Sequence, residues 1–282
     1  MRISADALAQ GQGSQWQGKH SAQRKGVLLW VALATLIMIV LFAPLAAPYD
    51  PLGEVGASLE APSPAHLLGT DLVGRDVWSR TLYGGRHTLQ IALIALVAAV
   101  LPGGVIGLLA GYLGYVVDSL LTIILDALLA IPGIVLALAW IAVVGRGPGQ
   151  VALAAGAALL PVYARVVRAA ARGVRHAPYI EAAVGLGVGW WGVLCRHILP
   201  NVRGVLLAEA FVILVWALLN AAALNFLGLG GDPAALEWGA MLADARSVYR
   251  AAPWVAAAPG VALTLVLILV GGAAAQAHER QH

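Results

Sequence analysis

Residues 88–111 read TLQIALIALVAAVLPGGVIGLLAG and contain no charged side chain. The hydrocarbon core of a bilayer is about 30 Å thick, and about 20 apolar residues in an α-helix cross it. This stretch is therefore predicted to be a transmembrane helix. Five more stretches are similarly apolar, and they lack the strand alternation of a membrane barrel. The six predicted spans cover residues 27–47, 88–111, 119–144, 151–172, 204–228 and 254–277.

The composition supports an all-α membrane protein. The 282 residues are 61% hydrophobic and 11% charged, whereas a soluble domain carries roughly a quarter charged residues. These values exclude an ordinary water-soluble globule and a disordered chain. The net charge of +3 arises from 17 basic and 14 acidic residues along an apolar chain, which favours positive cytoplasmic loops over nucleic-acid binding. The single cysteine, Cys195, excludes an intrachain disulfide.

The distribution of arginines predicts the orientation in the membrane. From residue 165 to residue 203 the chain carries six arginines and one acid, whereas acids outnumber arginines between the first two spans. The positive-inside rule places the arginine-rich side in the cytoplasm, together with the arm at 1–26 and the tail at 278–282. The first span is interpreted as an uncleaved anchor, because its apolar run is too long for a signal peptide.

The cytoplasmic segment 173–203 is unusually long for a connection between bundle helices, where 2–8 residues are common. Pro178 suits the first turn of a helix, and Glu181 lies near its N-terminus, where the helix dipole favours an anion. Gly185, Gly187 and Gly189 are predicted to end that helix, and residues 190–198 to form a second one before the fifth span. Such a segment is either a simple connector or a docking element for another protein, and its length favours docking.

Particular motifs in this segment resemble those of a known family. Glu181, Ala182 and Ala183, followed by Gly187 and by the pair Leu199-Pro200, resemble the EAA loop of the membrane subunits of bacterial ABC importers. Four other stretches resemble one branch, the second permease subunit of dipeptide, oligopeptide and nickel importers. They are HLLGTDLVGRDVWSR (66–80), LDALLAIPGIVLAL (125–138), NFLGLG (225–230) and EWGAML (237–242).

This resemblance implies the type I importer permease fold, with six transmembrane helices and a coupling helix that docks on a cytoplasmic ATPase. It also implies a sister permease, two ATPase subunits and an extracytoplasmic substrate-binding protein as partners, in the inner membrane of a bacterium. The mechanism it implies is alternating access. Coupling to the ATPase would fall on Glu181, Ala182, Ala183, Gly187, Leu199 and Pro200.

Catalytic motifs are missing from the sequence. There is no G-x-x-x-x-G-K-[ST] phosphate loop, so ATP and Mg²⁺ are expected on the partner ATPases and the chain is not expected to be an enzyme. The seven histidines do not pair at ligand spacing within a span, and no bound cofactor or metal is expected.

Polar residues inside the spans are the remaining candidates for function. Asp126, Asn220 and Asn225 either line the translocation path or form interhelical hydrogen bonds. Arg165, Arg168 and Arg172 share one helical face and are expected to reach the inner interface or lipid phosphates, with ATPase contacts as the alternative. Pro102-Gly103 and Pro132-Gly133 are possible kink points, as hinges or as packing irregularities.

Together these features predict a permease subunit of an ATP-driven importer of peptides. Two alternatives remain. The same machinery could import nickel or a metal chelate, or the chain could be a self-sufficient channel or secondary transporter.

Overall fold

The computed structural model describes residues 27–231 and 236–279, and within these ranges the regular structure is helical. The long helices are α3 (Val77–Tyr112), α4 (Tyr115–Leu129), α5 (Gly133–Val144), α6 (Pro148–Val174), α9 (Leu199–Phe226) and α11 (Pro253–Glu279). The short ones are α2 (Ala43–Ala46), α7 (Pro178–Gly185), α8 (Trp190–Val193), α10 (Trp238–Ala245) and a π-helical turn at Leu194–Ile198. The predicted arm at 1–26 and most of the predicted tail lie outside the described residues.

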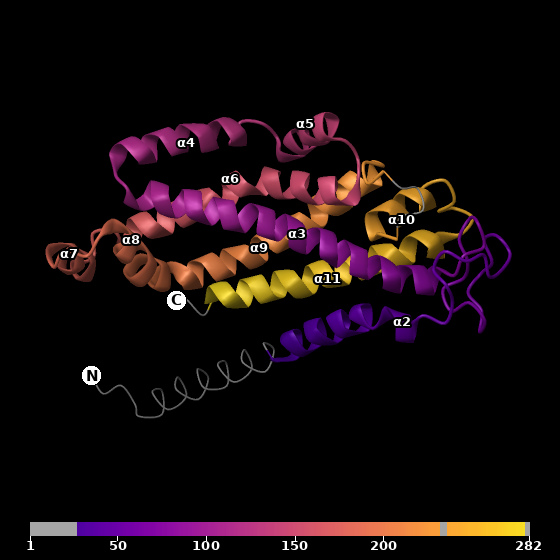
Figure 1. Ribbon diagram of the computed structural model, residues 1–282. Coiled ribbons are helices and arrows are strands. Elements are labelled where there is room, and N and C mark those ends of the chain that lie inside the picture. The colour runs from indigo at the N-terminus through magenta and orange to yellow at the C-terminus, as the bar shows by residue number, and fades with distance from the viewer. Residues whose placement is uncertain (1–26, 232–235, 280–282) are drawn as a thin grey trace, which may run out of the picture.

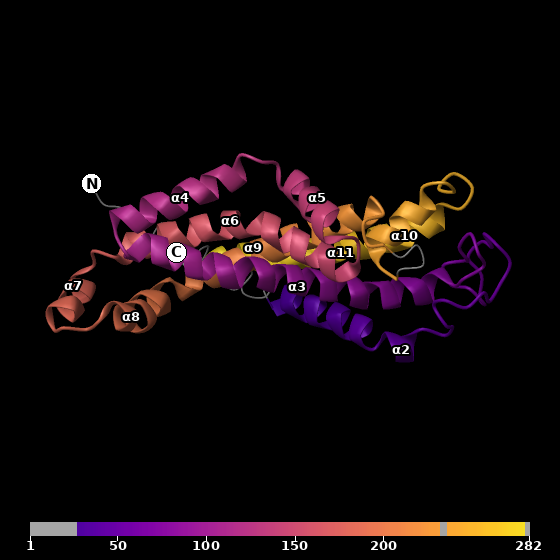
Figure 2. The same ribbon diagram turned by 45° about the horizontal axis from the view of Figure 1, so that its top comes forward.

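The long helices run side by side in an elongated bundle (Figures 1 and 2). The helices α3, α6 and α9 pack against one another, and α11 packs against α9 and α10. At one end of the bundle α7 and α8 project outward, while α10 and the irregular segment 48–76 lie at the opposite end. The start of the first helix and the end of α11 both point toward the α7 end (Figure 1).

The predicted spans fall on apolar helices. Among the residues that the structure describes, four helices are long and apolar enough to cross a bilayer, namely α3, α6, α11 and the continuous helix Trp190–Phe226. The helices α4 and α5 make a fifth crossing only as a pair bent by 88°. A further apolar helix, described over Val27–Leu41, is shorter.

The third predicted span, 119–144, is therefore not one helix. Proline has no N–H, and the residue before a proline is disfavoured in the α conformation. Pro132 accordingly becomes the N-cap of α5, with φ −52° and ψ 130°. By contrast, α3 continues without interruption through Pro102. Of the two possible kink points, the one at Pro132-Gly133 separates two helices.

The helix α3 begins at Val77, well before the predicted start of the second span at residue 88. Asp76 caps this helix by accepting a hydrogen bond from the backbone N–H of Ser79 at 2.8 Å, and its other oxygen lies 3.1 Å from Nδ1 of His66. This helix therefore begins before the apolar stretch that predicted it. Charged side chains near the start of this helix lower its local hydropathy, so hydropathy does not indicate a helix there. One of them, Arg80, is nevertheless buried and lies 3.4 Å from Asp71.

Glycines let α3 and α6 approach with their backbones almost in contact. Gly103, Gly107 and Gly111 recur at four-residue spacing on the side of α3 that meets α6. A Cβ atom at Gly107 would lie only 2.5 Å from the carbonyl oxygen of Ala164. Small residues at such spacing are typical of close helix packing in membranes, where dispersion contacts rather than hydrophobic burial hold helices together.

We expect Gly107→Ala to destabilise the bundle, because the added methyl group has no space against the α6 backbone. Overpacking of this kind costs about 1–3 kcal/mol. Gly104→Ala is the matched control, since its Cβ atom would meet Cε1 of Tyr163 at an ordinary 3.7 Å. The measurement is the thermal unfolding midpoint of the purified chain in detergent. Equal midpoints for the two variants would contradict the packing argument.

Candidate functional site

The segment 173–203 forms a helix, a glycine turn and a second helix, as the sequence predicts. The first helix, α7, stands at the tip of the bundle (Figure 1). The second helix is not a separate element, because it runs through the π-helical turn into α9. Pro200 has no N–H to donate to the carbonyl oxygen of Arg196 four residues earlier. The backbone N–H of Leu199 donates to the carbonyl oxygen of Leu194 five residues earlier, which is the π-helical pattern.

Local sequence explains both ends of α7. Pro178 occupies its first turn, where the missing N–H costs nothing. At the other end Gly187 adopts φ +82°, and the N–H groups of Gly187 and Val188 bond to the carbonyl oxygens of Val184 and Ala183 at 2.9 and 3.1 Å. This is a Schellman ending. Gly187 is therefore needed for its conformation, since a Cβ atom there would meet nothing within 4 Å.

The two faces of α7 have different roles. Ile180 and Ala183 are buried. Ile180 belongs to an apolar cluster with Ala171, Val193 and Ile198, which anchors α7 to the end of α6 and to the π-helical turn. Glu181 and Ala182, on the other face, are exposed. A short helix is thus held firmly by one side and offers its other side to a partner.

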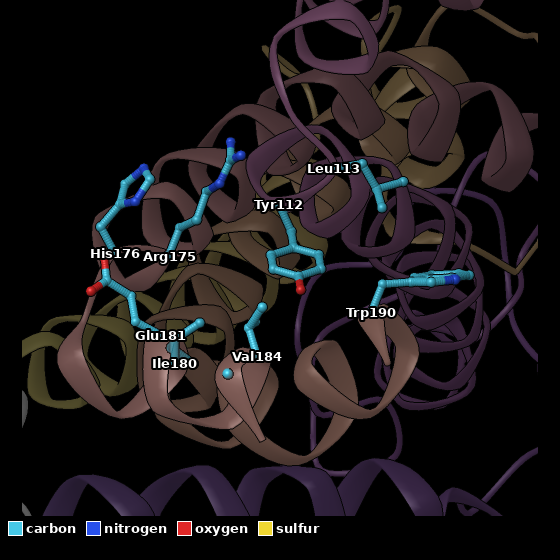
Figure 3. A pocket seen from close by; sticks show the side chains of 9 residues that line it. Tyr112, Leu113, Arg175, His176, Ile180, Glu181, Val184 and Trp190 are labelled. Carbon is cyan, nitrogen blue, oxygen red and sulfur yellow. The ribbon is translucent and has the colours of Figure 1, made fainter. Parts of the chain in front are cut away.

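A hollow of about 580 Å³ lies beside α7 (Figure 3). Tyr112 and Leu113 at the end of α3 line it together with Glu181, Val184 and Trp190. Large apolar side chains are exposed in this segment, namely Leu186 (86% exposed), Trp191 (61%) and Trp190 (53%), of which Trp190 lines the hollow. Exposed apolar side chains gathered beside polar ones are typical of protein interaction sites.

The structure does not place all six predicted coupling residues on one element. Glu181, Ala182 and Ala183 lie on α7, and Gly187 lies directly after it. Leu199 and Pro200 lie in the first turn of α9, where both are exposed. The two motif halves are joined by the continuous helix that starts at Trp190.

Ion pairs join α4 to α6. The carboxylate of Asp118 accepts two hydrogen bonds from the guanidinium of Arg168, one of them 2.9 Å long from Nη2. Its Oδ2 also lies 3.4 Å from Nη1 of Arg172. Asp126 lies 2.5 Å from Arg165. All three arginines thus pair with acids of α4, while the side chains of Arg165 and Arg172 stay 56% and 64% exposed, so their contact with the inner interface or lipid phosphates remains a prediction. The sequence reading missed Asp118, although its spacing of two helical turns from Asp126 is a usable signal.

The three polar residues predicted for the path do not meet in one site. Asp126 belongs to the ion pairs between α4 and α6, and the side chain of Asn220 donates to its own helix at the carbonyl oxygen of Trp216, at 2.8 Å. Asn225 is buried at the opposite end of the bundle from α7, where it lines a second hollow.

Comparison with known proteins identifies the family. Residues 103–281 match the family described as the binding-protein-dependent transport system inner membrane component. The chain belongs to this family. It is a multi-pass inner-membrane permease subunit of an ABC importer, and it is not itself catalytic, because the ATPase resides on separate subunits.

Similar proteins with curated names cover most of the chain. The dipeptide transport system permease protein DppC of Alkalihalophilus pseudofirmus is 36% identical, over 90% of this chain and 85% of its own length. The di/tripeptide transport system permease protein DppC of Pseudomonas aeruginosa is also 36% identical, over 90% of this chain and 86% of its own length. The glutathione transport system permease protein GsiD of Pectobacterium atrosepticum is 37% identical, over 87% of this chain and 82% of its own length.

Proposed function

We propose that this chain pairs with a sister permease to form an alternating-access pathway for peptides, which an extracytoplasmic binding protein delivers. Two cytoplasmic ATPases that bind ATP and Mg²⁺ drive the pathway through the segment 173–203. Peptides are the proposed cargo because the similar permeases are named for dipeptide, di/tripeptide and glutathione transport.

One observation carries the coupling role. The exposed face of α7 carries Glu181 and Ala182, and on its buried side Ile180 belongs to the same apolar cluster as the ends of α6 and α9. A push on α7 from a partner is therefore passed directly to the helices that cross the membrane. A simple connector would not need so firm an anchor or so many exposed apolar side chains beside it.

The proposed orientation follows from the same end of the molecule. The arginine-rich segment and α7 face the cytoplasm under the positive-inside rule. The start of the first helix and the end of α11 point to that side as well (Figure 1), so both termini are proposed to be cytoplasmic.

Reconstitution into liposomes tests the proposal. We expect ATP-dependent uptake of a labelled dipeptide when the chain is combined with its sister permease, the two ATPases and the external binding protein. We expect no uptake by the chain alone. Solute movement by the chain alone would favour the channel or secondary transporter, and uptake of labelled nickel in place of the dipeptide would favour a metal cargo.

A further inference from the structure

Two of the motifs noted in the sequence meet at the end of the bundle opposite α7. Asn225 begins the stretch NFLGLG, and Glu237 begins the stretch EWGAML. Together with residues of α3 they line a hollow of about 470 Å³. Its volume lies within the range of about 300–1,000 Å³ that is usual for small-molecule sites. Its walls include the apolar side chains of Ile91 and Ile94, which is also usual for such sites.

The Glu237 carboxylate is held rigidly in the wall of this hollow. Its side chain accepts hydrogen bonds from the backbone N–H of Ala240 at 3.0 Å and from the hydroxyl of Thr88 at 3.1 Å. The same hydroxyl accepts a hydrogen bond from the backbone N–H of Trp238 at 3.1 Å. Glu237 is only 2% exposed, so this acid has given up most of its hydration.

No cation compensates this acid within the described part of the chain, where none of the ion pairs involves Glu237. Burial raises the pKa of Glu237, and the hydrogen bonds from the neutral donors Ala240 and Thr88 oppose this increase. A buried carboxylate that accepts hydrogen bonds only from neutral groups is stabilised when a cation approaches it.

Asn225 provides a second polar group. It is 5% exposed, and its Nδ2 approaches the Glu237 carboxylate without forming a hydrogen bond of normal geometry. Its Oδ1 lies 2.4 Å from the place where a Cβ atom of Gly230 would be. The backbone of Gly230 therefore packs closely against the side-chain amide of Asn225 and restricts its orientation. A buried amide donor without a partner costs free energy until an acceptor reaches it.

We propose that this hollow is an outward-facing subsite for the peptide backbone, in which Glu237 binds the α-ammonium group and Nδ2 of Asn225 donates to a peptide oxygen. This inference rests on the proposed peptide transport. The α-amino group of a peptide has a pKa of about 7.7–8.0, so it is largely protonated at pH 7. The apolar wall accepts peptide side chains of differing size, while Glu237 and Asn225 bind the α-ammonium group and the backbone oxygen that all peptides share.

Glu237 also caps α10, so the test must separate binding from folding. Glu237→Gln keeps an oxygen for the backbone N–H of Ala240 and a polar group for Thr88, but it removes the charge. Glu54→Gln is the matched control, because Glu54 is an exposed acid that does not line the hollow.

The experiment measures whether a peptide shields the hollow from a thiol reagent. Gln90, which lines the hollow and is exposed, is changed to cysteine in a Cys195→Ser background. The assembled transporter, without the binding protein, is treated from outside with a membrane-impermeant maleimide, and labelling of this chain is followed. We expect a dipeptide to slow labelling and the same dipeptide with an acetylated N-terminus to have no effect. In Glu237→Gln the dipeptide concentration that gives half protection should rise at least about tenfold.

Equal protection by the free and acetylated dipeptides would overturn the proposal, as would unchanged protection in Glu237→Gln or its loss in Glu54→Gln. If Glu237→Gln does not fold, the comparison of the two dipeptides on the unchanged Glu237 background still decides. ATP-dependent uptake by the same preparation with the binding protein added reports on the proposed function separately. Uptake without protection rejects the subsite alone, whereas absence of uptake rejects peptide import.

Discussion

Glu181→Lys is expected to abolish peptide uptake by the assembled transporter while the chain still inserts and folds. Glu181 is exposed on α7, and surface substitutions of this kind usually change the free energy of unfolding by about 0.5 kcal/mol or less. At a docked interface the effect is much larger. Loss of one partner of a buried charge contact costs about 2–5 kcal/mol, which corresponds to a loss of affinity of about 30-fold or more.

The measurements are ATP-dependent uptake in liposomes and recovery of the ATPase with the purified chain. Glu54→Lys is the control, because it makes the same charge reversal at an exposed site in the segment at the other end of the bundle. Uptake at the unmodified level by a chain that carries both Glu181→Lys and Gly187→Pro would rule out the coupling role, because the second change also destroys the positive-φ ending of α7.

Features that depend on neighbouring residues could be predicted from the sequence. Hydropathy located the apolar helices, since membrane insertion is decided over windows of about 20 residues. Pro178 and Gly187 marked the start and end of α7 because both act on their own backbone conformation. Pro132 was indicated only as a possible kink point, and its division of the predicted span 119–144 into two helices was not predicted.

Features that depend on distant residues could not be predicted. Asp118 and Arg168 are 50 positions apart, and Thr88 and Glu237 are 149 positions apart. Nothing in either local pattern states that these residues meet. Glu237 shows the consequence, since it reads as a polar residue of an outer loop and becomes a buried carboxylate only when α10 folds back against α3 and α9. The glycine spacing in α3 was visible, but its partner α6 was not.

Asp118→Leu is expected to cause the largest loss of stability among the changes considered, because Asp118 neutralises arginines of α6. The side chains of Asp118 and Arg168 are 14% and 22% exposed, so the pair is partly desolvated. Removing one partner from a fully buried ion pair costs about 3–5 kcal/mol, since the other charge stays buried without compensation, and this range is the upper limit for the partly buried pair here. The readout is the unfolding midpoint of the detergent-solubilised chain and the fraction of chain recovered in the membrane.

The double variant Asp118→Leu, Arg168→Leu separates loss of the pair from the cost of an orphaned arginine. Replacing both charges of a buried pair by apolar groups is often close to neutral, so the double variant should recover most of the stability lost by Asp118→Leu. A double variant that is as unstable as the sum of the two single variants would show that Asp118 and Arg168 do not act as a pair. In that case α4 would be held to α6 by its apolar contacts, and the ion pairs would not define the position of the bent helix pair α4–α5.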